Sequence, residues 1–348
     1  MILLIKANYC ETVNFYLRNK QIDYLYKIVI DKYNYFFYNV YGSFRFKRIL
    51  VKMQLWRIIM YNIIVNPTGG KGKSLKTLSK VEEILKNKGC EYKVYKTDYK
   101  GHATEIVKEL SRIPDTKLIV LGGDGSFNEI LNGIECFENV TLGLVPCGTG
   151  NDFVSALKHP KKVKDAMDII LNGNAAFVDY IQLEDRRCLN VLGGGMDVDV
   201  LLKYAEMKHF HGKMKYYASL LYTLAHTKWH QLRLTLDDGE SMDRSVFMIG
   251  IGNGRSIGGG MPICPNAVVD DGKLSIVVVN QLKKSRIPTA LISFLSGKHV
   301  NKDFVEEFTA KKVRIDILDD SKFEADGEVF GAEKIECEVV SNKLKIYR

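Results

Sequence analysis

The chain has 348 residues, of which 46% are hydrophobic and 26% are charged. This composition excludes disorder over most of the chain, and the length predicts two domains. The seven cysteines are scattered without a Cys-x-x-Cys pair. That pattern argues against a disulfide framework or a zinc ribbon and favours a reducing cytoplasm. Every strongly apolar stretch is too short or too interrupted by charge to predict a membrane span.

The net charge of +9 is unevenly distributed. Residues 1–59 contain ten Lys or Arg and three Asp or Glu, a net charge of +7, whereas residues 60–348 carry only +2. Because the bulk of the chain is near neutral, we expect no nucleic-acid partner.

Residues 1–59 form an atypical N-terminal extension with eight of the eighteen tyrosines and no steady hydrophobic period. Three interpretations are open: a basic arm on a membrane surface, a helical accessory segment, or a dispensable sequence. The alternation of apolar and basic residues at 44–48 is typical of the first. We favour the third, because Ile, Lys, Asn, Tyr and Phe share A/T-rich codons. A start placed too far upstream would give this composition, with Met53 or Met60 as the natural start.

From Met60 onward the pattern becomes regular. Short apolar runs predict strands at 61–67, 92–97, 117–121 and 141–145. Helical spacing predicts helices at 74–88, 103–111 and 127–132, with Gly89 and Gly133 as helix stops. This alternation predicts a Rossmann-like parallel α/β domain over residues 60–178. Ligands of such sheets bind beyond the carboxyl ends of the strands.

Beyond residue 178 the pattern changes to short strands separated by Gly and Asp turns. We place them at 231–237, 246–251, 274–279, 313–318, 335–340 and 344–347. They predict an all-β domain over residues 179–348, arranged as a β-sandwich, with one helical stretch at 198–227. The last strand is a candidate to return to the first domain.

The first glycine-rich loop is Asn-Pro-Thr-Gly-Gly-Lys-Gly-Lys-Ser at 66–74. Glycines let backbone N–H groups approach phosphate oxygens, and the next helix offers its N-terminus to an anion. Lys71 adds a point charge for a phosphate. The loop nearly matches a Walker A motif, but Pro67 replaces a required glycine, so we disfavour a P-loop NTPase. For this loop alone, a plain strand–helix turn is an equal alternative.

The second loop is Gly-Gly-Asp-Gly-Ser at 122–126. Its glycines permit close approach to a polyphosphate, Asp124 can hold Mg²⁺ through water, and Ser126 can donate to a phosphate. The third loop, at 146–153, offers Thr149 to a phosphate and Asp152 to the same metal. A glycine turn capped by aspartate is the alternative for the second loop.

These motifs, followed by Asp-Asp-Gly at 270–272 and Ala-Asp-Gly-Glu at 325–328, occur in an order that resembles the diacylglycerol kinase catalytic-domain family. The resemblance is closest to the bacterial soluble lipid kinases and covers residues 60–348. Ser126 stands where the family usually has Thr, and the hydroxyl is kept. The resemblance implies an α/β domain of the NAD-kinase and diacylglycerol-kinase type, a β-sandwich domain for the lipid substrate, and ATP bound between them. It also implies transfer of the γ-phosphate to a lipid hydroxyl, foremost that of diacylglycerol, which would give phosphatidic acid.

The resemblance further implies the site residues. Nucleotide contacts would fall on Asn66, Pro67, Thr68, Gly69, Gly70, Thr97, Gly122, Gly123, Asp124, Gly125, Ser126, Asn128 and Thr149. A carboxylate network at the catalytic Mg²⁺ would comprise Asp124, Asp152 and Asp179.

A carboxylate can accept the proton of the acceptor hydroxyl, and the resemblance assigns this general-base role to Glu328. Taken alone, the Asp-Gly pair before Glu328 indicates only a hairpin turn. The Asp-Asp-Gly segment also indicates a hairpin turn when taken alone. The resemblance implies a structural Mg²⁺ there, held by Asp271 and by the carbonyls of Val268 and Lys273.

Three functions remain open. The leading one is an ATP-dependent lipid kinase. The second is a kinase of related fold acting on phosphatidylglycerol, a sphingosine- or ceramide-like lipid, or NAD, and the third is a catalytically silent nucleotide- or lipid-binding protein. The third glycine loop and the terminal Asp-Gly-Glu favour the lipid branch, and the intact Asp124, Asp152 and Glu328 argue against a silent protein.

We expect ATP and Mg²⁺ in the site and a lipid acceptor at a membrane surface. The expected location is cytoplasmic, with transient peripheral membrane contact, and a homodimer is left open. An apolar helical stripe at Tyr216, Tyr217, Leu220, Leu221 and Leu224 predicts core packing, with a membrane-touching lip as the alternative. Lys213 and Lys215 beside it could meet lipid headgroups. We interpret His209 and His211 as part of a solvated helix face.

Overall fold

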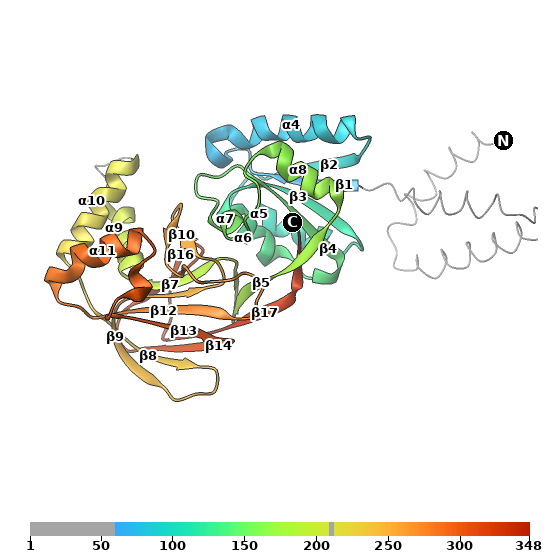
Figure 1. The fold of residues 1–348 in the computed structure, drawn as a ribbon. Helices are drawn as coiled ribbons and strands as arrows, with labels where there is room; N and C mark the ends of the chain where they lie inside the picture. Colours follow the sequence, from blue (N-terminus) through green and yellow to red (C-terminus); the bar gives the residue numbers. More distant parts are fainter. Residues whose placement is uncertain (1–59, 209–211) are drawn as a thin grey trace, which may run out of the picture. The chain divides into compact units, whose positions relative to one another are not determined.

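A computed structural model describes residues 60–208 and 212–348, without the side chains at 212 and 213. The predictions for residues 1–59, His209, His211 and the Lys213 side chain therefore lie outside the described residues. Residues 60–348 form one compact unit, in which an α/β half and a mainly β half are connected by shared strands (Figure 1).

The α/β half is built on parallel strands that pair in the order β2 (Glu91–Lys96), β1 (Met60–Val65), β3 (Thr116–Gly122) and β4 (Val140–Pro146). Helices cover both faces of this sheet, so its central strands are buried almost end to end. Odd-numbered residues of β1 and β3 pack against α4 (Lys73–Asn87) and α8 (Val163–Asn172). Even-numbered residues pack against α5 (His102–Leu110) and α6 (Asp124–Gly133). The predicted parallel α/β domain is confirmed.

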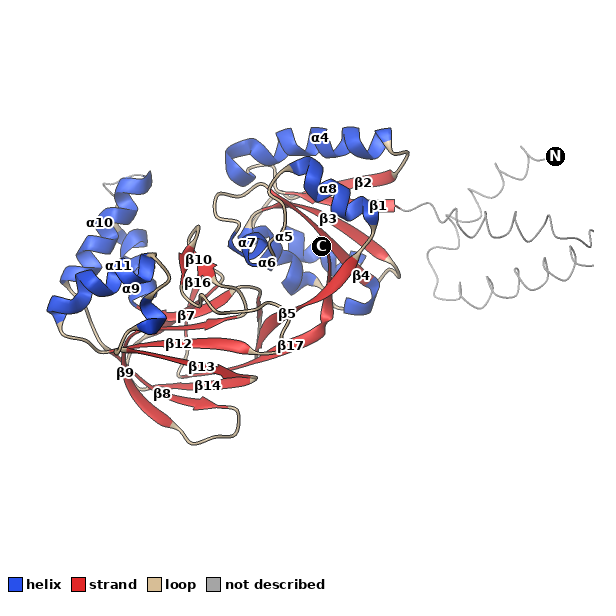
Figure 2. Ribbon diagram, viewed as in Figure 1, coloured by secondary structure: helices blue, strands red, loops and turns tan. Residues whose placement is uncertain are grey.

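The second half is a mainly antiparallel β structure with a small ribbon and three helices at one end, which confirms the predicted sandwich-like fold class (Figure 2). Its strands are β5 (Ala175–Leu183), β6 (Arg187–Cys188), β7 (Val191–Gly195), β8 (His230–Leu236), β9 (Met242–Gly252), β12 (Leu274–Asn280), β13 (Val305–Ala310), β14 (Lys312–Ile317), β15 (Lys322–Ala325), β16 (Glu328–Gly331) and β17 (Lys334–Tyr347). The ribbon is β10 (Ser256–Ile257) with β11 (Met261–Pro262), and the helices are α9 (Met196–Glu206), α10 (Gly212–Ala225) and α11 (Ile287–Leu295).

The last strand belongs to both halves. β17 pairs antiparallel with β14 and β5 and pairs in parallel with β4 at Lys345 and Ile346. The two strands predicted at 335–340 and 344–347 are thus one strand of 14 residues. A register shift between Val340 and Leu344 breaks its alternation, which is why the pattern indicated two strands.

Two further predictions on elements need correction. Helix α6 begins at Asp124 instead of Phe127, so the second glycine loop is shorter than expected. The helical stretch predicted at 198–227 is divided into α9 and α10. Among the described residues, none of the helices is long and apolar enough to cross a bilayer.

Candidate active site

An open pocket of about 660 Å³ lies at the carboxyl ends of β1, β2 and β3. This volume falls in the range of small-molecule sites. Eight of the residues predicted to contact a nucleotide line this pocket: Asn66, Pro67, Thr68, Gly70, Thr97, Gly123, Gly125 and Ser126. It is also lined by Gly148 of the third loop and by Tyr99, Lys100 and Glu129, which the sequence motifs do not indicate.

The other predicted contact residues do not line this pocket: Gly69, Lys71, Gly122, Asp124, Asn128 and Thr149. Gly122 makes room for its neighbour, since a Cβ there would collide with the Ser126 side chain. The Asn128 side chain accepts a hydrogen bond from Asn132 Nδ2 (2.5 Å), one turn further along α6.

The first loop is closed by its own side chains. Asn66 Oδ1 accepts hydrogen bonds from the Thr68 N–H (3.0 Å) and hydroxyl (2.9 Å). Ser74 Oγ donates to the carbonyls of Asn66 (2.5 Å) and Gly69 (3.1 Å). In a Walker A loop the corresponding hydroxyl would face Mg²⁺. Here the Ser74 hydroxyl is used inside the loop, which supports the rejection of a P-loop NTPase.

Glycines allow the three loops to touch backbone to backbone. A Cβ on Gly70 would collide with the Cys147 carbonyl oxygen, and Gly70 has a left-handed φ of 57°. A Cβ on Gly123 would lie only 2.9 Å from the Cα of Gly148. The glycines are therefore required by loop packing as well as by any approach of phosphate.

The structure brings Asp124 and Asp152 together across Gly150. A Cβ on Gly150 would lie 3.1 Å from the Oδ2 atom of each carboxylate. Asp124 Oδ1 accepts a hydrogen bond from the Phe153 N–H (3.1 Å), in the first turn of α7 (Asp152–Ala156). No hydrogen bond from the described residues reaches Asp124 Oδ2, so this oxygen is free for a metal-bound water.

Asp152 links the two halves. It is buried, and its oxygens accept hydrogen bonds from Ser256 Oγ (3.0 Å) and from the Gly259 N–H (2.8 Å). Both donors belong to the glycine-rich segment of the β half. The bonds of Asp152 therefore hold that segment against the nucleotide loops.

Asp179 lies elsewhere, against the loop predicted to hold a structural metal. Its Oδ2 accepts a hydrogen bond from the Gly272 N–H (2.8 Å), and its own N–H donates to the Val269 carbonyl (2.8 Å). Burial raises the pKa of the Asp179 carboxyl, and the nearby Asp271 and Asp270 raise it further.

The loop at 268–273 fits a hard cation in its chemistry. Asp271 is exposed, and its Oδ1 accepts a hydrogen bond from the Lys273 N–H (3.0 Å). Arg348 pairs with Asp270. Within the described ranges, no group of three His, Cys, Asp or Glu side chains could hold a metal. A cation in this loop would thus need backbone carbonyls, and Mg²⁺ accepts oxygen ligands completed by water.

Glu328 does not line the pocket but contacts Lys100, which does. It is the first residue of β16, and its Oε1 is 2.5 Å from Lys100 Nζ, which comes from the segment after β2. The hydrogen bond and charge of Glu328 raise the pKa of the Lys100 ammonium, with a smaller contribution from Glu129. Lys100 therefore connects the pocket of the α/β half with Glu328 of the β half.

The Asp-Gly pair before Glu328 forms a hairpin turn that presents this side chain. Asp326 and Gly327 have left-handed φ angles of 49° and 89° between the paired Ala325 and Glu328. The half-buried Asp326 accepts backbone hydrogen bonds on its carboxylate from Leu189 (2.6 Å) and Asn190 (2.9 Å). These bonds fix the turn to the segment that enters β7. The segment is therefore a hairpin turn, and a hairpin turn is compatible with a site role for Glu328.

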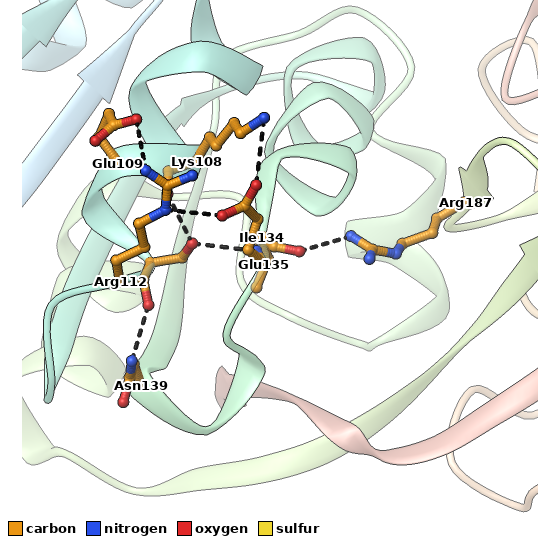
Figure 3. Close-up of polar contacts among 8 residues, drawn as sticks. Lys108, Glu109, Arg112, Ile134, Glu135, Asn139 and Arg187 are labelled. Atoms are coloured by element: carbon orange, nitrogen blue, oxygen red, sulfur yellow. Dashed lines mark hydrogen bonds and ion pairs between the residues drawn. The ribbon is translucent and has the colours of Figure 1, made fainter.

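Helix α6, which begins at Asp124, is anchored at its other end (Figure 3). Arg187 of β6 donates to the carbonyls of Leu131 (2.9 Å) and Ile134 (2.7 Å). Arg112, at the end of α5, donates to Glu135 (2.8 Å) just beyond α6. Cations near a helix C-terminus satisfy its last carbonyls and complement its dipole. These contacts fix the axis that points Asp124 toward the loops.

A pocket walled by glycine loops at the carboxyl edge of a parallel sheet defines a phosphate-binding α/β protein. Sequence comparison narrows this class. The profile of the diacylglycerol kinase catalytic domain matches residues 60–183, and that of the YegS C-terminal NAD kinase beta sandwich-like domain matches residues 190–348. The chain belongs to the diacylglycerol kinase family, as its motifs indicate, and carries that family's kinase catalytic domain.

Individual relatives support the same family assignment. The chain is 32% identical to a diacylglycerol kinase of Staphylococcus saprophyticus over 77% of its own length and 88% of the relative. It is 28% identical to a diacylglycerol kinase of Bacillus subtilis over 77% and 89% of the two chains. A crystal structure of a diacylglycerol kinase from Bacillus anthracis shares the fold, with a TM-score of 0.63, 22% identity, and coverage of 83% of this chain and 96% of that one.

Proposed function

We propose that the protein is an ATP-dependent lipid kinase that transfers the γ-phosphate of ATP to the hydroxyl of diacylglycerol, giving phosphatidic acid and ADP. The observation that carries the proposal is the ion pair of the Glu328 carboxylate with Lys100, a residue that lines the glycine-walled pocket. Phosphoryl transfer needs phosphate-binding groups and a proton acceptor at one place.

In this proposal the glycine loops hold the phosphates of ATP in the pocket. The acceptor hydroxyl forms a bond to the γ-phosphorus, the bond from that phosphorus to the bridging oxygen breaks, and ADP leaves. Glu328 takes the hydroxyl proton, and Lys100 offsets charge on the phosphates.

The proposed metal contacts follow the two acidic places in the structure. Asp124, with its free Oδ2, would hold a catalytic Mg²⁺ through water, and that ion would supply charge neutralisation on the phosphates. Asp152 would contribute mainly by fixing the neighbouring loops, because both of its oxygens already accept hydrogen bonds. Asp271 with the Val268 and Lys273 carbonyls would hold a structural Mg²⁺ beside Asp179.

Diacylglycerol is favoured as the acceptor because relatives that are 28–32% identical are diacylglycerol kinases by name. The experiment is transfer from labelled ATP to a panel of diacylglycerol, phosphatidylglycerol, sphingosine, ceramide and NAD, with Glu328→Gln as the matched negative. We expect diacylglycerol to accept phosphate at the highest kcat/KM. Preferred transfer to another acceptor would overturn the assignment of the substrate. ATP binding without any transfer would indicate a silent protein.

A further inference from the structure

We propose that the outer face of α10 and α11 docks on the surface of an anionic phospholipid bilayer. This inference rests on the proposed lipid acceptor and names the surface through which the enzyme would reach it. Six of the fourteen large apolar side chains exposed in the described residues lie on these two helices, namely Met214, Tyr217, Leu221, Tyr222, Ile292 and Leu295. We call these six residues the docking face.

The exposure does not result from a lack of core. Met214, Tyr217 and Leu221 follow helical spacing along one side of α10. The other side of α10, with Tyr216, Leu220 and Leu224, packs against the same core as Ile287, Ala290 and Phe294 of α11. The stripe predicted from the sequence is therefore split, with Tyr216, Leu220 and Leu224 inward and Tyr217 and Leu221 outward. A helix with one apolar side buried and another exposed marks an interaction surface.

The charges around the docking face select an anionic occupant. The sequence contains no Asp or Glu between 207 and 236 or between 281 and 302. The same two stretches contain Lys208, Lys213, Lys215, Lys228, Arg233, Lys283, Lys284, Arg286, Lys298 and Lys302. Arg233 and Arg286 form ion pairs with Asp243 and Asp303, so the eight lysines carry the excess of positive charge. Since residues 60–348 carry only +2 in total, this excess is local. Basic residues beside an apolar helix face are typical of binding to anionic lipid headgroups.

Two lysines lie against aromatic rings at the same end of the molecule. Lys203 Nζ, which also pairs with Glu206 (3.1 Å), is 3.9 Å from the ring centroid of Tyr222, and Lys215 Nζ is 4.4 Å from that of Tyr204. Aromatic rings paired with ammonium groups suit the boundary between headgroups and acyl chains. A second copy of the chain would instead bring another set of positive charges to the same face, so a bilayer fits better than a homodimer.

The space beneath the helices cannot hold a lipid tail. The apolar gap lined by Leu224, Phe247 and Phe294 measures about 20 Å³, which is room for about one water molecule. The lipid contacts would therefore be made by the outer face.

The docking face is connected to the nucleotide loops by a short path. Asp152 accepts a hydrogen bond from Gly259, and Met261 of the following β11 packs on the core that α10 and α11 share. A Cβ on Gly297, just after α11, would lie 3.4 Å from Pro262. Docking at α10 and α11 would thus hold the bilayer beside the half that carries Glu328 (Figure 1).

The test is flotation of the full chain with phosphatidylcholine vesicles that contain or lack phosphatidylglycerol. We would compare Leu221→Glu, Ile292→Glu and their combination with Ile113→Glu and Leu318→Glu. On the docking face, Leu221 is 67% exposed and Ile292 is 70% exposed; elsewhere, Ile113 is 54% exposed and Leu318 is 51% exposed. Because all four side chains are exposed, all the variants should fold. We expect the double docking-face variant to lose at least about tenfold in binding to phosphatidylglycerol vesicles. We also expect added salt to weaken wild-type binding, and both control variants to bind normally.

A second readout separates this inference from the proposed function. On a short-chain diacylglycerol dispersed in water, the docking-face variants should keep wild-type kcat. Equal vesicle binding by the double variant and the controls would overturn the docking face. The docking face would also be overturned if the double variant lost oligomers, measured by light scattering, but kept vesicle binding. That result would show that the face is a homodimer interface. If wild-type protein phosphorylates no lipid in any form, the proposed function fails, while flotation still decides the docking face.

Discussion

Lys100 Nζ lies 2.5 Å from Glu328 Oε1, although the two residues belong to different halves of the molecule. Both side chains are largely exposed, and an ion pair of this kind contributes only about 0–1 kcal/mol to stability. Hydrogen bonds from an ammonium to phosphate oxygens are charge-assisted as well, and a polyphosphate offers several acceptor oxygens. In the proposed reaction, a polyphosphate in the pocket would therefore draw Lys100 away from Glu328 at little cost, and the carboxylate would then be free to accept the proton.

Lys100→Met should raise the KM for ATP by about tenfold, equivalent to about 1.4 kcal/mol of lost phosphate binding. Lys100→Arg should recover part of this loss because it keeps the charge. The measurement is steady-state kinetics at varied ATP. Lys312→Met is the matched control, since Lys312 pairs with Glu338 at 3.8 Å on the β half. An unchanged KM in Lys100→Met would show that Lys100 does not contact the nucleotide.

Glu328→Gln should lower kcat by about 10²–10⁴, because the amide keeps the size of the side chain but cannot take the proton. ATP affinity should not weaken, since the substitution also frees Lys100 from its ion pair. Saturating ATP and diacylglycerol give kcat, and calorimetry gives the affinity, with Glu338→Gln as the control. Near-wild-type kcat across the pH range, with chemistry rate-limiting, would remove Glu328 from the role of base.

The sequence predicts the parts of the fold that depend on local pattern. Strands buried on both faces produce continuous apolar runs, and the helices between them have clear spacing, so the α/β half and the edge that carries the pocket are predictable. The sequence does not reveal α11, because its short apolar run looks the same in a helix and in a strand. The bulge in β17 also has no signal of its own.

The site is predictable only where a motif carries it. Loop glycines and Asp124 have recognisable spacing, whereas the pairing of Lys100 with Glu328 joins residues far apart in the chain and follows from tertiary structure alone. One weak signal for Lys100 is its position after a parallel strand, at the edge where ligands bind. A motif can also group residues that the fold separates. The motif order groups Asp179 with Asp124, whereas its hydrogen bonds connect it to Gly272.

Gly150→Ala should lower kcat strongly and lower the melting temperature only slightly. The new Cβ would lie 3.1 Å from one oxygen each of Asp124 and Asp152 and 3.3 Å from the Gly259 Cα. These neighbours must shift by a few tenths of an ångström, which alters the carboxylate that would position Mg²⁺. Kinetics and thermal melting test this, with Gly331→Ala as the control because a Cβ there would meet nothing within 4 Å. Full activity in Gly150→Ala would show that this spacing is not needed.

Asp271→Ala should reduce stabilisation by Mg²⁺ without changing kcat at saturating metal. An ion that binds only the folded protein stabilises it by about 2.7 kcal/mol at a hundredfold excess over its Kd. Melting would be measured with Mg²⁺ and with a chelator, and Asp238→Ala, in an exposed turn, serves as the control. If wild-type protein melts identically in both conditions, the loop at 268–273 is a plain hairpin turn.

The last prediction concerns the buried Asp197, at the start of α9. Its carboxylate oxygens are buried without a hydrogen-bond partner, and a Cβ on Gly193 would collide with Asp197 Oδ2 and lie 3.1 Å from Glu324 Oε1. The pKa of Asp197 is raised from 3.8 to about 7, chiefly by burial and to a smaller extent by the charge of Asp199, while the backbone N–H groups of Val198 and Asp197 and the charge of His230 oppose the shift. Burial and the charge of Asp197 also raise the pKa of Glu324.

Because the folded pKa of Asp197 lies above the unfolded value, its contribution to stability is greatest below about pH 4 and is lost as the pH rises to about 7. Asp197→Asn removes this titration, so its melting temperature should fall less between pH 5 and pH 8 than that of wild type. The buried His159 and His299, whose pKa values are lowered by burial, act in the opposite direction but equally in both proteins. Asp168→Asn, on the exposed side of α8, should match the wild-type slope. Parallel slopes in wild type and Asp197→Asn would show that Asp197 does not take up a proton on folding.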